Sequence, residues 1–364
     1  MKKISFLLIL TMVIGMLSGC AGTPVVYYSD CTCPVDSHEV APEATEPAEK
    51  PTEAPVLAEG ALKTGLYIST GIGDSKSAAA EENGEAKYDV TMVAVLVDDN
   101  GVIQDCIIDG VSTAVAFDAA GAVVTDLTAA PQTKNELGDN YGMVAWGGAI
   151  AEWDAQAAAL ASYAVGKTVE ELRSGAVNES GYAADADLAS SATIYLGGYV
   201  SAIEAAVGNA QHLGAQAGDT LKMAATTGID GSKNADAENA GNAQLDVTVT
   251  ALTMNGEVIT SCAIDAVQAK VSFDASGTIT SDVSAPVQTK NELGENYGMV
   301  AWGGAIAEWD TQAASFAAYV TGKTPAEVAG IAVTETTKPA EADLSSSVTI
   351  AIGGFQALIA KAAQ

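Results

Sequence analysis

The chain has 364 residues, of which 46 are Asp or Glu and 16 are Lys or Arg, so its formal net charge is -30. A surface this acidic repels phosphate, which argues against a protein that binds nucleic acid. The sequence has only two histidines, His38 and His212, which argues against a histidine-based catalytic triad or zinc site.

Residues 1–20 are typical of a bacterial lipoprotein signal peptide. Two lysines are followed by an apolar stretch, residues 4–16, that is too short for a comfortable membrane span. The sequence Leu17-Ser18-Gly19-Cys20 then resembles a lipobox. The resemblance implies that Cys20 is lipidated and anchors the protein to the extracellular face of the cell membrane. An ordinary signal peptide, cleaved after small residues, is the alternative.

Residues 21–60 are expected to form a disordered tether. Six of the ten prolines precede residue 56, where they are interspersed with Glu and Ala. Such a composition cannot bury a core and favours an extended chain. Cys31 and Cys33 lie in this segment at a spacing that is poor for a mutual disulfide.

The rest of the chain is an internal duplication. Residues 132–158 match residues 288–314 at 25 of 27 positions. Two copies with this spacing indicate tandem domains rather than a solenoid, whose repeating units are far shorter. We expect a first domain at 61–212 and a second at 213–364.

Each repeat is predicted to contain a β-hairpin. In the first, residues 88–97 and 102–108 are rich in β-branched side chains and flank Asn100-Gly101. This dipeptide is a strong hairpin signal, because both turn residues need positive φ. An apolar run at 114–117 and a glycine-marked turn at Gly121 predict a third and a fourth strand. The second repeat carries the same features at 245–254, 258–264, 269–273 and Asn255-Gly256.

Helices are predicted in the second part of each repeat. Apolar residues recur on one helical face from Ile150 to Ala164, and again from Ile306 to Val320. Capping boxes begin at Thr168 and Thr324, and terminal helices are expected near 200–206 and 355–360. The fold class is therefore predicted to be α+β, with each repeat an antiparallel sheet followed by helices.

Cys106 and Cys262 occupy equivalent positions, and each is the only cysteine of its repeat. Both fall in predicted strands. We expect them to be small buried hydrophobic residues rather than redox-active thiols.

A cluster of small residues that ends in threonine precedes each terminal helix: Asp187-Leu188-Ala189-Ser190-Ser191-Ala192-Thr193 and Asp343-Leu344-Ser345-Ser346-Ser347-Val348-Thr349. It resembles the acceptor motif Asp-x-x-Ser-Gly-Ala-Thr of the FMN-binding domain family. That family includes subunits of the sodium-pumping quinone reductase and Rnf complexes, and Gram-positive surface flavin lipoproteins used in extracellular electron transfer. Its final threonine is esterified to FMN by a flavin transferase, which implies covalent FMN on Thr193 and Thr349.

The resemblance assigns the remaining motif positions residue by residue. The acid of the motif corresponds to Asp187 and Asp343, and the small residues correspond to Ser190, Ser191, Ala192, Ser346 and Ser347. Serine replaces the family's glycine in both copies, and Val348 replaces its alanine in the second copy. The alternative interpretation is a Ser/Thr-rich helix entry whose hydroxyls cap free backbone donors.

Aromatic residues are concentrated in the nearly identical segment. Tyr141 and Trp146, with Tyr297 and Trp302 in the second copy, are predicted to line a pocket in which a flavin ring stacks, because neighbouring glycines allow close approach. Trp153 and Trp309 are expected to anchor the core instead. We expect Lys134 and Lys290 to be solvated loop residues; contact with a flavin phosphate is the alternative.

The sequence as a whole predicts a lipid-anchored flavoprotein that carries electrons and is not itself an enzyme. Its expected partners are the flavin transferase, a membrane quinone or NADH dehydrogenase system as electron donor, and the membrane itself. The alternative is a cofactor-free surface binding or adhesion lipoprotein with duplicated domains. A solute-binding lipoprotein is less suitable, because nearly identical halves are unlike the two lobes of such proteins.

Overall fold

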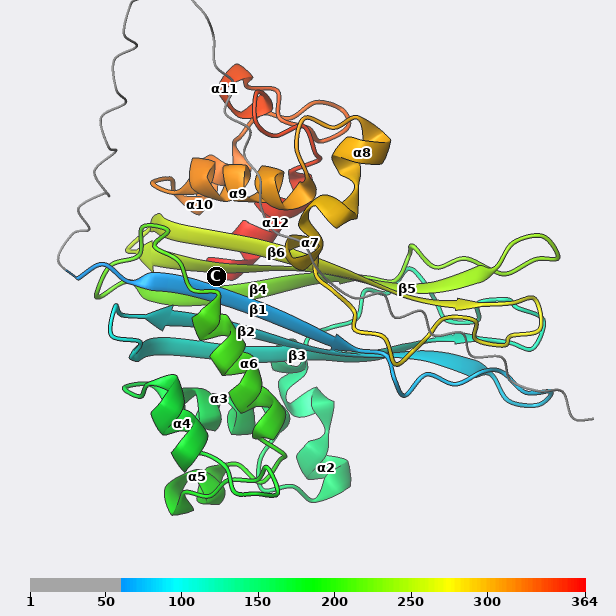
Figure 1. Ribbon diagram of the computed structural model, residues 1–364, viewed down its shortest axis with the longest axis horizontal. Coiled ribbons are helices and arrows are strands. Elements are labelled where there is room, and N and C mark those ends of the chain that lie inside the picture. The colour runs from blue at the N-terminus through cyan, green and yellow to red at the C-terminus, as the bar shows by residue number, and fades with distance from the viewer. Residues whose placement is uncertain (1–59) are drawn as a thin grey trace, which may run out of the picture. The chain divides into compact units, whose positions relative to one another are not determined.

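The computed structural model describes residues 60–364, which begin at the first strand of the first repeat (Figure 1). The predicted signal peptide, the lipidation site Cys20 and the tether at 21–59 lie outside the described residues. Those three predictions are therefore not addressed by the structure.

The first repeat forms a three-stranded antiparallel sheet, in the order β1-β2-β3. Strand β1 spans Lys63–Gly71, β2 spans Gly84–Val97 and β3 spans Ile103–Phe117. The predicted hairpin joins β2 to β3. Gly101, in the connection between these strands, has φ +80°, the left-handed conformation that favours glycine.

The second repeat forms an equivalent sheet from β4 (Thr220–Gly228), β5 (Gly241–Asn255) and β6 (Val258–Phe273). The predicted α+β class is confirmed. Two details were wrong. Residues 114–117 are not a separate strand but the end of β3, because β2 starts early enough to pair with them as far as Phe117. The fourth strand expected after Gly121 is only an isolated bridge between Phe117 and Val123. Strands β1 and β4 were not predicted.

Residues 92–97 of β2 are buried on both faces of the strand, which explains their continuous apolar sequence. Nearer the start of β2, Lys87 and Asp89 are exposed and only one face is buried. In β2, Val93 and Val95 pack toward helices of the first repeat. The alternate residues Met92 and Ala94 pack into a second cluster shared with the other sheet. Successive side chains of a strand point to opposite faces, so a strand covered on both sides needs apolar residues at every position.

Helices follow each sheet. The first repeat has α1 (Lys134–Leu137), the 3-10 turn η1 (Gly138–Tyr141), α2 (Met143–Gly147), α3 (Trp153–Ala164), α4 (Val169–Gly175), α5 (Ala186–Ser191) and α6 (Gly197–Gly208). The second has α7 (Lys290–Leu293), η2 (Gly294–Tyr297), α8 (Met299–Gly303), α9 (Trp309–Val320), α10 (Pro325–Ala329), α11 (Ala342–Ser345) and α12 (Gly353–Ala362). None of the helices in the described part of the chain combines the length and hydrophobicity needed to span a bilayer.

The predicted helix ends are largely confirmed. Thr168 and Thr324 form the expected capping boxes, and further capping boxes are present at Thr133 and Thr289. The predicted start at Ile150 was wrong, because α3 begins only at Trp153. Ile150 lies outside the helix and 55% of it is exposed.

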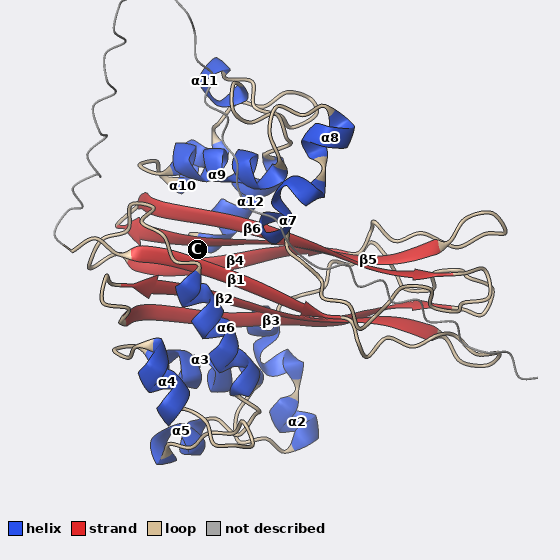
Figure 2. Cartoon of the chain, viewed as in Figure 1, coloured by secondary structure: helices blue, strands red, loops and turns tan. Residues whose placement is uncertain are grey.

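The two sheets pack face to face, and the helices of each repeat cover part of the outer face of its own sheet, while one end of the long strands extends beyond them (Figure 2). The described residues, 60–364, form one compact unit, in which both repeats contribute to the central hydrophobic cluster. At one end of the interface the rings of Phe117 and Phe273 stack, with centroids 4.0 Å apart and planes inclined by 1°.

The contacts between the repeats are reciprocal. The Ala78 N–H donates to the Gly277 carbonyl at 2.8 Å, and the Ala235 N–H donates to the Gly121 carbonyl at 2.7 Å. Gly277 has φ +70°, and a Cβ there would lie 2.5 Å from the Asp118 carbonyl oxygen. Glycine is therefore required both for the turn and for the close approach. Such pairwise contacts are those of an isologous dimer contained within one chain.

Candidate functional site

The two candidate acceptor threonines lie in equivalent loops. Thr193 is exposed in the segment between α5 and α6, and Thr349 is half-buried between α11 and α12. Each loop reaches the N-terminus of the last helix of its repeat. The predicted position of the small-residue cluster, directly before a terminal helix, is therefore correct.

A buried glutamine holds each threonine. The side-chain oxygen of Gln156 accepts hydrogen bonds from the Thr193 N–H at 2.8 Å, the Thr193 hydroxyl at 3.2 Å and the Ile194 N–H at 3.2 Å. Its amide nitrogen donates to the Ala151 carbonyl at 2.7 Å. Gln156 is 0% exposed, so the amide fixes the loop against the start of α3 from within the protein.

The second repeat reproduces this arrangement. Gln312, also 0% exposed, accepts from the Thr349 N–H at 2.7 Å and from the Thr349 hydroxyl at 3.1 Å. Sequence analysis missed both glutamines. A signal was available, because each occupies a core-facing position of an amphipathic helix, where an unpaired amide is costly.

The residue before each threonine points into the core. Ala192 is 1% exposed and packs in the helix-covered core of its repeat, as Val348 does at 0%. The larger side chain at the second site therefore adds volume to the core and does not crowd the hydroxyl. The Ala-to-Val departure from the motif leaves the surroundings of Thr349 open.

The other motif residues are exposed at the ends of short helices. Ser190 donates its hydroxyl to the Asp187 carbonyl at 2.6 Å, and Ser346 donates to the Asp343 carbonyl at 2.8 Å. Ser191 and Ser347 are exposed and also bond weakly to backbone carbonyls of their own helices, at 3.5 and 3.3 Å. The N-cap of α5 is Asp185. Asp187 lies within the helix, and its side chain is exposed.

The aromatic residues predicted to line a pocket lie mostly at the surface. Trp146 on α2 and Trp302 on α8 are each 91% exposed. A buried carboxylate holds α2 in place, since Glu152 accepts from the Met143 and Val144 N–H groups at 2.8 and 2.9 Å. Tyr141 and Tyr297 are half-buried against the helix layer. The structure thus does not bring Trp146 or Trp302 into an enclosed pocket.

Lys134 and Lys290 do not extend freely into solvent. The Lys134 ammonium lies over the rings of Tyr141 and Trp153, at 5.4 and 4.9 Å from their centroids. Lys290 lies 5.0 Å from the centroids of Tyr297 and Trp309. These cation–π contacts hold each lysine on the helix layer. Trp153 and Trp309 are 3% and 7% exposed, which confirms their predicted role in the core.

A tyrosine pair distinguishes the first site from the second. Tyr182 and Tyr195 meet edge to face, with centroids 5.9 Å apart, and are 48% and 55% exposed. Tyr195 follows Thr193 by two residues, so this exposed aromatic surface borders the first loop. The corresponding residues of the second repeat are Lys338 and Ala351. Sequence analysis missed the pair because it is not duplicated.

Cys106 on β3 and Cys262 on β6 are 7% and 3% exposed, as predicted. Burial raises the pKa of each thiol to about 12. A thiol with so high a pKa holds almost no nucleophilic thiolate at neutral pH. The prediction of structural rather than redox-active cysteines is consistent with both observations.

Asp265, at the position equivalent to Asp109, is 8% exposed on β6. Burial raises the pKa of its carboxyl to about 6, although the Thr289 side chain and the N–H groups of Asn291 and Ala266 hydrogen-bond to it. The folded state therefore binds this proton more tightly than the unfolded state does. Stability from this group is highest below pH 4 and is lost as the pH rises to about 6.

Asp265→Asn is expected to remove this dependence. Relative to the parent protein, the variant should gain on the order of 3 kcal/mol of unfolding free energy between pH 4 and pH 7. Urea unfolding at pH 4, 5 and 7 measures the difference. Parallel pH profiles for the two proteins would contradict the prediction.

Among residues 60–364, no cluster of three or more His, Cys, Asp or Glu side chains has the geometry to hold a metal ion. Comparisons with protein-family models, curated proteins and solved structures give no match to this chain. Function must therefore be argued from the site itself.

Proposed function

We propose that the protein is an extracellular electron carrier with covalent FMN on Thr193 and Thr349. One observation carries the proposal: in both repeats a buried glutamine presents the same threonine hydroxyl at the surface, in a loop of small residues before a helix. A transferase must reach such a hydroxyl, and the slim side chains of Ser190 and Ser191 leave room for it.

The residues around Thr193 fit a phosphate ester. Helix α6 has 12 residues and starts with Gly197-Gly198, four positions after the threonine. The Gly197 N–H donates to the Gly181 carbonyl at 3.0 Å, so the N–H groups that can favour an anion at this end, together with the helix dipole, are those of Gly198 and Tyr199. This local field matters in a chain with a net charge of -30, whose other surfaces repel phosphate.

The surroundings also fit a planar ring, and they differ between the two sites. Tyr195 and Tyr182 offer exposed aromatic edges and faces beside Thr193. The second loop lacks them, since Lys338 and Ala351 stand there. A bound flavin supplies one- and two-electron redox chemistry, and its potential depends on the groups that contact it. Two flavins in unlike surroundings would therefore differ in reduction potential.

The partners that follow from this proposal are a flavin transferase, which loads the threonines, and a membrane quinone or NADH dehydrogenase system, which donates electrons. Lipidation of Cys20 would keep the carrier at the membrane. The protein would transfer electrons without transforming a substrate of its own.

Mass analysis of the mature protein from a host that contains the transferase tests the proposal. We expect one FMN on the peptide with Thr193 and one on the peptide with Thr349. Thr193→Ala with Thr349→Ala should remove all covalent flavin and leave the fold intact. Ser191→Ala with Ser347→Ala is the matched control, which removes neighbouring exposed hydroxyls and should keep both flavins. Bare masses for both parent peptides would overturn the proposal.

A cofactor-free binding protein is the second candidate, and the exposed indoles favour it. Trp146 and Trp302 are each 91% exposed and lie beside exposed Val144 and Val300. Exposed large apolar side chains that gather on one part of a surface are typical of interaction sites. If the parent peptides carry no flavin and Trp146→Ala with Trp302→Ala abolishes attachment to cell surfaces, the adhesion function is supported instead.

A further inference from the structure

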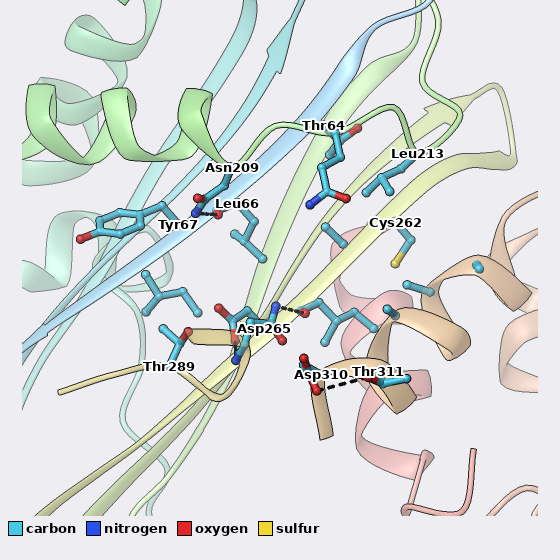
Figure 3. Close-up of a pocket in the computed structure, with 18 of the residues that line it drawn as sticks. Thr64, Leu66, Tyr67, Asn209, Leu213, Cys262, Asp265, Thr289, Asp310 and Thr311 are labelled. Carbon is cyan, nitrogen blue, oxygen red and sulfur yellow. Dashed lines mark hydrogen bonds between the residues drawn. The ribbon is translucent and has the colours of Figure 1, made fainter. Parts of the chain in front are cut away.

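A cavity of about 1080 Å³ lies where β1 of the first repeat meets β6, α7 and α9 of the second (Figure 3). Its lining includes three carboxylates, on Asp265, Glu292 and Asp310, and no Lys or Arg among the described residues that form it. His212 also lines the cavity and bonds through Nε2 to Asp99 at 2.9 Å. The cavity is therefore strongly acidic.

Because the fold is duplicated, the cavity has an equivalent position in the other half of the molecule, and that position is occupied by a lysine side chain. There, Lys361 on α12 donates its ammonium to the Ala225 carbonyl on β4 at 2.6 Å. The same ammonium pairs with the Glu136 carboxylate on α1. An edge-strand carbonyl and a capping-box glutamate from opposite repeats thus form an ammonium site.

The counterparts of both ligands lie in the cavity. Ile68 is the sixth residue of β1, as Ala225 is of β4, and Glu292 is the third residue of α7, as Glu136 is of α1. Both Ile68 and Glu292 line the cavity. The ninth residue of the terminal helix differs: it is Lys361 in α12 but Ala205 in α6. On this side, none of the lysines among residues 60–364 lines the cavity.

Both acceptors in the cavity, the Glu292 carboxylate and the Ile68 carbonyl, are free to bind an ammonium group. In the Lys361 site, Oε2 of Glu136 accepts the capping hydrogen bond from Thr133 at 2.9 Å, and Oε1 receives the lysine. Glu292 likewise uses Oε2 for the capping bond, from Thr289 at 2.8 Å, which leaves Oε1 for another donor.

The Ile68 carbonyl faces the outer edge of its sheet. The N–H of Thr64 and the carbonyl of Leu66 both bond away from β2, to Gln211 and Asn209. Alternate residues of an antiparallel strand direct their backbone groups to the same side, so Ile68 does as well. Figure 3 shows Asn209 and Leu66 at the border of the cavity.

We propose that this cavity binds a small primary alkylamine from solution. Its ammonium would donate to the Ile68 carbonyl and to Oε1 of Glu292, as Lys361 does in the other half. Asp310 and Asp265 add negative potential, and the protein's net charge of -30 draws cations toward the surface. The proposal does not depend on the flavin.

Calorimetric titration of the mature protein with cadaverine at low ionic strength tests it. We expect a Kd of about 1 mM or lower. Pentamethonium, the bis-trimethylammonium analogue with the same five-carbon spacer, has both charges of cadaverine but no N–H donor and should bind at least tenfold more weakly. Glu292→Gln should also weaken cadaverine at least tenfold, and because glutamine also forms capping boxes the helix start is kept. Glu136→Gln, the matched control, should leave the cadaverine affinity unchanged.

Ala205→Lys provides the complementary variant. Its new lysine should occupy the site from within, as Lys361 does opposite, and abolish cadaverine binding. If cadaverine does not bind at about 10 mM, the proposal is wrong. It is equally wrong if pentamethonium matches cadaverine, or if Glu292→Gln and Ala205→Lys, shown to be folded by circular dichroism, bind cadaverine as the parent does.

Discussion

Phe117→Ala is expected to lower the unfolding free energy of the whole of residues 60–364 by about 3–5 kcal/mol. Phe117 and Phe273 are both 0% exposed, and their rings stack at 4.0 Å across the two sheets. Each ring also covers a glycine that begins a strand, since a Cβ on Gly84 would lie 2.4 Å from the Phe117 ring. Truncation would therefore leave a cavity bordered by both repeats.

Urea unfolding followed by circular dichroism measures this effect. Because the central hydrophobic cluster contains residues of both sheets, we expect one transition that moves as a whole. Trp146→Ala is the control: it deletes a larger side chain that is 91% exposed, and should change stability by less than about 0.5 kcal/mol. If two transitions are seen and Phe117→Ala shifts only the transition of the first repeat, the two halves unfold independently.

The shared core marks the limit of what the sequence predicted about the fold. The Asn-Gly turns identified both hairpins, because the signal is local. Strand β1 (Lys63–Gly71) was missed because apolar and polar residues do not strictly alternate in its sequence. No short turn signal joins it to β2 either. The β-branched run in β2 predicted a strand but not which of its faces are buried. It could not reveal that one face meets the other repeat, since that contact joins residues distant in the chain.

The candidate site was predictable to a similar extent. The loop that carries Thr193 was located by its small residues and by the helix that follows. Gln156 was missed because it reaches the threonine across a separation of 37 residues. The acidic cavity lies beyond sequence reasoning, since Ile68 and Glu292 meet only when the two sheets pack.

Gln156→Met should release the first threonine loop and leave the second unchanged. Methionine nearly conserves volume but removes the oxygen that accepts from Thr193 and Ile194. Leaving these part-buried donors without their acceptor should cost about 1–2 kcal/mol. The amide protons of Thr193 and Ile194 should then exchange at least tenfold faster, as hydrogen–deuterium exchange with peptide mass analysis can measure.

Gln312→Met is the reciprocal control, which should free Thr349 and leave Thr193 protected. If the flavin proposal holds, the threonine of the altered repeat should also lose at least tenfold in FMN occupancy, because its hydroxyl is no longer held in one position. Faster exchange with unchanged FMN would limit the glutamine to a structural role in the loop. Unchanged exchange at Thr193 and Ile194 in Gln156→Met would instead show that the side-chain amide does not hold the loop.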